Sequence, residues 1–187
     1  PSAPNVTELK WAYPLNTSVI SGGAYYAGQN VIVDGYLYAT GGGKLHKVDV
    51  ETGEGEVLNE DAGTTISYYD YLCYADGILI LATQNELCAY NLYGEKLGSV
   101  VGDYKEYHPV QYHDGYVFCN GYIYELIQAD DTATFNMVGE GTIGGDVFNW
   151  SSGVFVNDMF WVASKTAVYT VDYKTNTLID KYIFDPD

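Results

Sequence analysis

One short phrase recurs four times along the chain, and this repetition constrains the fold more than any other feature. Four turn sequences, spaced by 42, 38 and 43 residues, carry it: Asp34-Gly35, Asp76-Gly77, Asp114-Gly115 and Asn157-Asp158. Asp-Gly is a strong hairpin signal because both central positions of the turn tolerate a positive φ. Strand-forming runs flank each turn, as NVIV and YLYAT flank the first. Each repeat is therefore predicted to begin with a β-hairpin.

Two more strands complete each repeat. The third strands are KLHKVDV, ELCAYNL, YIYELIQ and AVYTVDY, and the more polar fourth strands are GEVLN, EKLGSVV, TFNMV and TLIDKYIF. Four antiparallel strands in units of about 40 residues are typical of β-propeller blades. The sequence therefore predicts an all-β fold, a β-propeller built of four-stranded antiparallel blades, with negligible helix. A β-sandwich is the rival fold, but it gives no reason for a fourfold repeat.

The repeats span about residues 24–62, 66–104, 107–141 and 148–187, so that residues 1–187 form a single propeller segment. Residues 8–15 are predicted to add an extra N-terminal strand. Because the last repeat already has its outer strand, TLIDKYIF, this extra strand is expected to serve a further blade. An uncovered blade face of ~500 Å² would forfeit ~12 kcal/mol of burial. The four repeats are therefore expected to be part of a larger ring, to be completed by a second copy as a homodimer, or to close as a compact four-bladed ring.

The charge of the chain excludes some classes of partner. Eight basic against 25 acidic residues give a formal net charge of −17. Nucleic acids are excluded because their binding depends on clustered Lys and Arg. No run of 18 apolar residues occurs, so no membrane insertion is expected. The charge serves solubility through self-repulsion, or presents an acidic face to cations or to basic groups of a partner.

Cysteine content and composition bear on the compartment. The three cysteines, Cys73, Cys88 and Cys119, have no metal-type spacing and lie in apolar strand patterns, so buried free thiols are expected. The chain starts at Pro-Ser-Ala-Pro without Met or a signal peptide, and is interpreted as a piece of a longer product. Its acidic, Tyr-, Gly- and Asn-rich composition favours an extracellular or cell-surface location.

The third strand of the first repeat and its exit, LHKVDVETGE, resemble the repeat of pyrroloquinoline-quinone-type β-propellers. The shared pattern is a strand, Asp, two residues, Thr-Gly and an outer strand, and residues 169–176 and 89–94 are looser copies. The resemblance covers about residues 30–184. Quinone-using members of that family carry a Trp soon after Thr-Gly, where Val57 or Leu58 stands here, and commonly have adjacent cysteines, which this chain lacks. The resemblance therefore implies a blade architecture in a non-catalytic member, without a cofactor.

The loops that lead into the first strand of each repeat carry clustered aromatic residues. The candidate ligand-binding residues there are Tyr25, Tyr26, Tyr68, Tyr69, Tyr107, His108 and Trp150. In a propeller, such loops form a ring on one face, where aromatic rings can stack on sugars or flat ligands. The alternative is that the rings fill the space between blades. Asp70 and Asp146 lie in the same loops and form a candidate acid–base pair or cation site.

These patterns lead to one predicted function and two alternatives. The prediction is a non-catalytic secreted or cell-surface module that binds a protein or glycan partner through the aromatic-rich loop face. The first alternative is an enzyme of the quinoprotein or carbohydrate-active type, with Asp70 or Asp146 as acid or base. The second is a structural spacer. No catalytic or metal site and no cofactor is predicted, since the three His residues are scattered and Gly41-Gly42-Gly43 lacks the context of a phosphate loop.

Overall fold

The structure is a computed structural model, and it describes residues 9–15, 29–63, 70–104, 109–139, 142–143, 146–147, 153–164 and 166–184. These residues form strands and turns, and none of them is helical. Accordingly, the described part contains no helix long and apolar enough to cross a membrane. The prediction of an all-β fold is confirmed.

The described residues form four antiparallel four-stranded sheets, and in each of these the strands are paired in chain order. Sheet 1 consists of β1 (Val31–Val33), β2 (Tyr36–Gly41), β3 (Lys44–Asp49) and β4 (Gly55–Asn59). Sheet 2 consists of β5 (Tyr71–Ala75), β6 (Ile78–Ala82), β7 (Glu86–Asn91) and β8 (Lys96–Val101). Sheet 3 consists of β9 (Gln111–His113), β10 (Tyr116–Cys119), β11 (Tyr122–Ala129) and β12 (Thr132–Gly139). Sheet 4 consists of β15 (Val154–Val156), β16 (Met159–Ala163), β17 (Ala167–Asp172) and β18 (Thr177–Ile183). A short hairpin of β13 (Thr142–Ile143) and β14 (Asp146–Val147) lies between sheets 3 and 4 in the sequence.

The recurring turn connects the first two strands of each four-stranded sheet. Asp34 and Gly35 have φ angles of 49° and 82°, and the equivalent Asn157 and Asp158 have 49° and 59°. Two consecutive positive φ angles define the type I′ turn, whose twist matches that of the flanking strands. The hairpins predicted from the Asp-Gly phrase are thereby confirmed.

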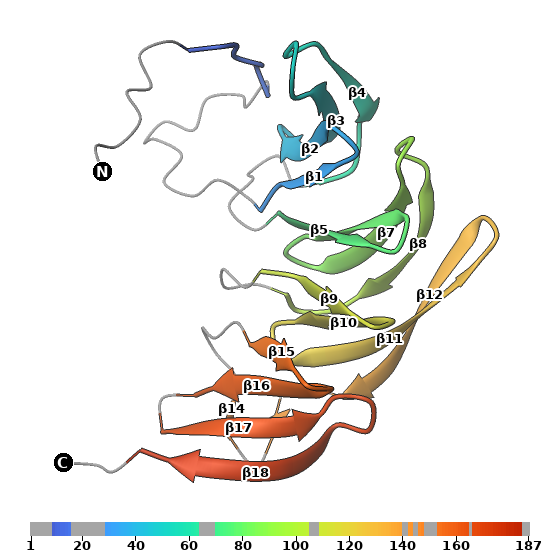
Figure 1. Cartoon of the computed structure of the whole chain (residues 1–187). Helices are drawn as coiled ribbons and strands as arrows, with labels where there is room; N and C mark the ends of the chain where they lie inside the picture. The colour runs from blue at the N-terminus through green and yellow to red at the C-terminus, as the bar shows by residue number, and fades with distance from the viewer. Residues whose placement is uncertain are drawn as a thin grey trace, which may run out of the picture.

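The sheets follow one another in a stack, with sheets 1 and 4 at its two ends (Figure 1). Among the residues that the structure describes, three apolar cores lie between consecutive sheets, centred on Tyr38 and Leu79, on Ile80 and Tyr124, and on Phe118 and Phe160. All five residues of β6 are buried, because sheets 1 and 3 cover the two faces of sheet 2. The outermost strand β18 is mostly exposed. This burial agrees with the apolar middle strands and polar fourth strands of the sequence.

The N-terminal segment, residues 9–15, has no strand assignment, unlike the extra strand expected at 8–15. It packs through its side chains on the face of sheet 1 that points away from sheet 2. The indole Nε1 of Trp11 donates a hydrogen bond to the Val50 carbonyl at 2.9 Å, and the Tyr13 hydroxyl lies 3.3 Å from Nδ1 of His46. Side-chain packing, not ladder hydrogen bonding, attaches this segment to the sheet.

Candidate functional site

Most of the predicted loop residues lie outside the described part of the chain. These are Tyr25, Tyr26, Tyr68, Tyr69, Tyr107, His108 and Trp150. Asp146 begins β14, but its side chain is not described. Asp70 is described, and so are the residues at which the four loops end. These loop ends lie at the starts of the inner strands β1, β5, β9 and β15.

The inner strands start beside one another. The Leu72 amide, at the start of β5, donates a hydrogen bond to the carbonyl of Gln29, just before β1, at 3.1 Å. In the same way, Nε2 of Gln111 at the start of β9 donates to the carbonyl of Gly153, just before β15, at 2.7 Å. β5 and β9 are also in contact. The four inner strands thus begin along one common edge of the stack, which we call the inner-strand edge.

Asp70 lies at this edge but is directed into the protein. It is fully buried, and its carboxylate packs against Gly63 in the segment after β4. A carboxylate out of contact with water needs polar partners within the protein, and Asp70 is not without an interaction partner. The structure therefore places Asp70 where it connects the start of sheet 2 to the end of sheet 1.

The two histidines that the structure describes, His46 and His113, lie in different sheets. His46 is buried in sheet 1, where its Nε2 lies 3.2 Å from the Gly41 carbonyl and its Nδ1 faces the Tyr13 hydroxyl. Because a carbonyl only accepts hydrogen bonds, Nε2 carries the proton that is donated to Gly41. His113 instead stacks on Phe155 with ring centroids 4.7 Å apart. Within the residues that the structure describes, no three His, Cys, Asp or Glu side chains are grouped so as to hold a metal ion.

The three thiols are inside the stacked sheets. Cys73, Cys88 and Cys119 are buried and free, as the sequence predicted. Burial raises the pKa of Cys73 and of Cys88 to about 12, and burial likewise raises the pKa of Cys119. Since the thiolate is the nucleophilic form, none of these groups is a nucleophile near neutral pH.

The aspartate of the resemblance motif has a structural role. Oδ1 of Asp49 accepts hydrogen bonds from the Thr52 and Glu51 amides, both at 2.8 Å, and these bonds lower the pKa of Asp49. In the equivalent turn of sheet 2, Oδ1 of Asn91 accepts from the Tyr93 amide at 3.0 Å. Sheet 4 repeats the arrangement with Asp172. The Asp or Asn therefore closes the turn between the third and fourth strands.

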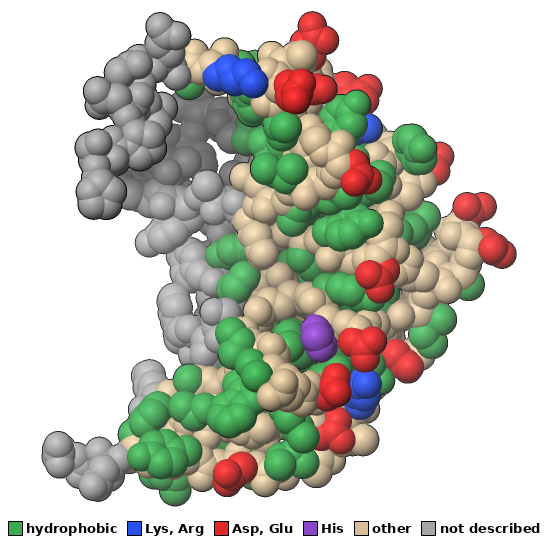
Figure 2. All heavy atoms as spheres, in the orientation of Figure 1, with side chains coloured by type: hydrophobic (Ala, Val, Ile, Leu, Met, Phe, Trp, Pro, Cys, Tyr) green, Lys and Arg blue, Asp and Glu red, His purple; other side chains and the backbone are tan. Residues whose placement is uncertain are grey.

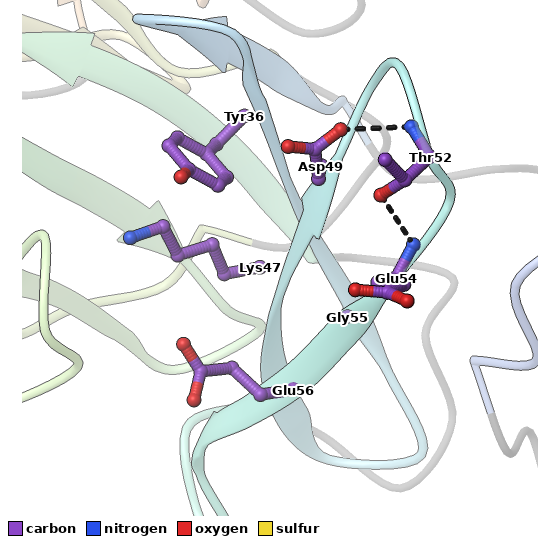
Figure 3. Close-up of a pocket in the computed structure, with 7 residues that line it drawn as sticks. All are labelled: Tyr36, Lys47, Asp49, Thr52, Glu54, Gly55 and Glu56. Atoms are coloured by element: carbon purple, nitrogen blue, oxygen red, sulfur yellow. Dashed lines mark hydrogen bonds between the residues drawn. The ribbon is translucent and has the colours of Figure 1, made fainter.

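A shallow hollow of ≈ 370 Å³ lies beside this turn in sheet 1 (Figure 3). It is lined by Tyr36, Lys47, Asp49, Thr52, Glu54, Gly55 and Glu56. The Lys47 ammonium lies 4.2 Å from the centroid of the Tyr36 ring. Antiparallel register assembles the hollow, because Tyr36 pairs with Asp49 and Lys47 with Glu56. The sequence alone does not predict this hollow, because the register of the strands is not visible in the order of residues.

Comparison with known proteins identifies the fold but no family. No family model matches the chain, and no curated protein matches it. Among solved structures, a chain of the mitotic checkpoint complex matches with a TM-score of 0.58 and 11% identity over 96% of this chain. The match spans 61% of the length of that other chain.

The fold is a β-propeller. The WD40 domain of SCAP from fission yeast is also similar, with a TM-score of 0.39 and 10% identity over 81% of this chain and 50% of that domain. Because the fold is a β-propeller, sheets 1 to 4 are its blades 1 to 4. The inner-strand edge is then the edge at which the connections between blades arrive, and a likeness at 11% identity establishes nothing beyond this architecture.

Proposed function

We propose that the chain is a non-catalytic β-propeller module that binds a partner protein through the inner-strand edge. The observation that carries this proposal is the adjacency of the four strand starts, seen in the hydrogen bonds from Leu72 to Gln29 and from Gln111 to Gly153. Each start is preceded in the sequence by a loop with aromatic residues. A rigid scaffold that carries variable loops at one edge is a common way to build a binding surface.

The side chains in these loops favour a protein partner. Tyr and Trp are enriched at protein interfaces, where they contribute a large contact area at a low cost in conformational entropy. The same rings can stack on sugars, so glycan binding is the competing outcome of the test. The fold supports a scaffold role, while the kinship with quinone-type repeats and the extracellular or cell-surface location stay predictions.

A matched pair of variants tests the proposal. Tyr26→Ala combined with Tyr69→Ala removes one ring from each of two loops. Tyr93→Ala removes a ring that is 78% exposed in the turn between β7 and β8, at the opposite edge of blade 2. A protein captured by the wild-type chain from its source extract, then purified, should bind the double variant at least about tenfold more weakly, as expected when central aromatic contacts are lost. It should bind Tyr93→Ala with unchanged affinity.

Two results would overturn the proposal. One is equal affinity of the purified partner for the wild type and the double variant. The other is a saturable response on a glycan array that the double variant loses, which would assign the edge to glycans. A turnover activity abolished by Asp70→Asn in a folded protein would favour the enzyme alternative.

A further inference from the structure

The face of blade 4 that points away from blade 3 carries several exposed apolar side chains. Val154 is 57% exposed, Val156 46%, Trp161 43% and Tyr182 72%. Strand register places these side chains on the same face. Val154 pairs with Trp161, and Val156 and Ala163 each lie two residues further along their strands, so they share that face. Ala163 pairs with Val168, and Val168 pairs with Tyr182. We call these four residues the blade-4 end face. Hydrophobic side chains gather over this end of the molecule (Figure 2).

The residues of blades 1 to 3 that correspond to Trp161 are buried between blades. Trp161 is the third residue of the second strand of its blade. Its counterparts in blades 1, 2 and 3 are Tyr38, Ile80 and Phe118, whose side chains are 2%, 0% and 2% exposed. Each belongs to the core shared with the following blade. The blade-4 end face thus has the position and the apolar character of an interface between blades, continuous with three interfaces that the structure already contains.

The opposite end of the stack is different, because the N-terminal segment covers part of it. In blade 2, the turn at Gly94 packs against Leu58 of β4, the outer strand of blade 1. In blade 1, the equivalent turn at Gly53 packs against Trp11. Trp11 therefore lies where the outer strand of a preceding blade would lie.

This position of Trp11 argues against a second copy as the occupant of the blade-4 end face. If blade 1 of a second copy packed on the blade-4 end face, β18 of the first copy would take the place of the preceding outer strand. Residues 9–15 of the second copy already occupy that place. In a back-to-back arrangement, the blade-4 end faces of two copies would pack against each other. Two chains of formal charge −17 would then repel each other. Each would also bring Asp180 into the contact, because Asp180 pairs with Thr170, which pairs with Trp161.

We propose that the blade-4 end face docks a further antiparallel β-sheet of the blade type, supplied by polypeptide outside these 187 residues. Its packing face is apolar, like the face of blade 4 that covers Phe118 with Phe160 and Tyr169. This inference does not depend on the proposed binding at the inner-strand edge, since it concerns a different surface.

The test appends a blade as a probe. A copy of residues 153–184 is joined after Asp187 by a Gly/Ser linker as long as segment 140–152, so that its Phe160 can meet Trp161 of the original blade. Val156→Cys in the original blade reports on coverage through its rate of maleimide labelling, because the native cysteines are buried. The appended blade should slow labelling of this introduced thiol at least about tenfold, as stable packing protects a surface. Tyr93→Cys, far from this face, should label at the same rate with and without the probe.

Each outcome decides the proposal. Loss of protection of the introduced thiol when Trp161→Asp is made in the original blade of the fused chain supports docking through this face. Unchanged labelling of the Val156→Cys variant in a folded fusion, judged by circular dichroism, overturns it. Light scattering that shows a dimer of the unfused chain, with the introduced thiol already protected and Trp161→Asp restoring the monomer, also overturns it and assigns the face to a second copy.

Discussion

Burial controls the chemistry of individual side chains in this propeller, and the thiols show this most directly. Cys73 and Cys88 have pKa values of about 12 because of desolvation. At pH 8 the native protein is therefore expected to react with a thiol-specific disulfide reagent only as fast as it unfolds. In guanidinium chloride all three thiols should react at once. Rapid reaction of even one thiol in the native protein would contradict this prediction.

The carboxylate of Asp49 should make stability depend on pH in one direction. Amide hydrogen bonds from Thr52 and Glu51 lower the pKa of Asp49 in the folded state. The stability that the ionised carboxylate contributes is therefore fully present above its pKa in the unfolded chain, and it is lost as the pH falls through its pKa in the folded protein. Asp49→Ala should therefore lower the melting temperature at pH 7, and the gap to the wild type should narrow towards pH 3. Thermal unfolding followed by circular dichroism measures both.

A control in the same turn isolates the effect of Asp49. Glu51 takes part in these bonds only through its backbone amide. Glu51→Ala should leave the melting temperature and its pH profile close to those of the wild type. A gap between Asp49→Ala and the wild type that stays constant from pH 7 to pH 3 would show that the carboxylate charge is not what stabilises the turn.

At the scale of elements, the N-terminal segment stabilises blade 1 by covering its outward face. Trp11 is partly buried, contacts the Gly53 turn and donates a hydrogen bond to Val50. Trp11→Ala should lower the free energy of unfolding by about 2 kcal/mol, less than the loss of a fully buried Trp. Trp11→Phe keeps the ring contact and should cost about 1 kcal/mol, the value of one hydrogen bond. Urea unfolding measures both, and equal stability of all three proteins would mean that the segment does not hold the sheet.

The strands were predictable because their determinants are local. The Asp34-Gly35 turn has the required positive φ angles, and the apolar run from Ile78 to Ala82 is buried as its composition indicated. The mode of attachment of residues 9–15 was not predictable, since the alternation that indicates a strand also suits a segment held by Trp11 and Tyr13 side chains. The burial of Asp70 and the hollow beside Lys47 depend on contacts between strands that are distant in sequence. Hydrophobic patterning carries no signal for such contacts.

For the whole molecule, the two proposed surfaces are separate, which has consequences for function. The inner-strand edge collects the starts of β1, β5, β9 and β15, whereas the blade-4 end face covers one end of the stack. A sheet docked on the end face would leave the inner-strand edge free. Coverage of the stack by a further sheet and binding of a partner at the loops are therefore compatible in one assembly.

The net charge should limit the stability of the molecule at low salt. With 25 acidic and eight basic residues, the folded chain concentrates like charges in a small volume, and the described ion pairs, such as Lys44 with Glu60, lie at the surface and are worth little. Raising NaCl from ~20 mM to ~300 mM shortens the screening length severalfold. We expect the free energy of unfolding to increase by about 1 kcal/mol, which corresponds to a rise of about 2–4 °C in the melting temperature.

A variant with fewer charges distinguishes repulsion from other effects of salt. Glu51, Glu54, Glu56 and Glu125 are exposed, and changing all four to Gln removes negative charge without touching the cores. This variant should melt higher than the wild type at low salt and should gain less from added NaCl, because less repulsion remains to be screened. Scanning calorimetry at a series of NaCl concentrations gives, for each protein, the slope of melting temperature against salt. Identical slopes would show that salt acts on the apolar surfaces instead, since salting-out strengthens burial regardless of the protein's charge.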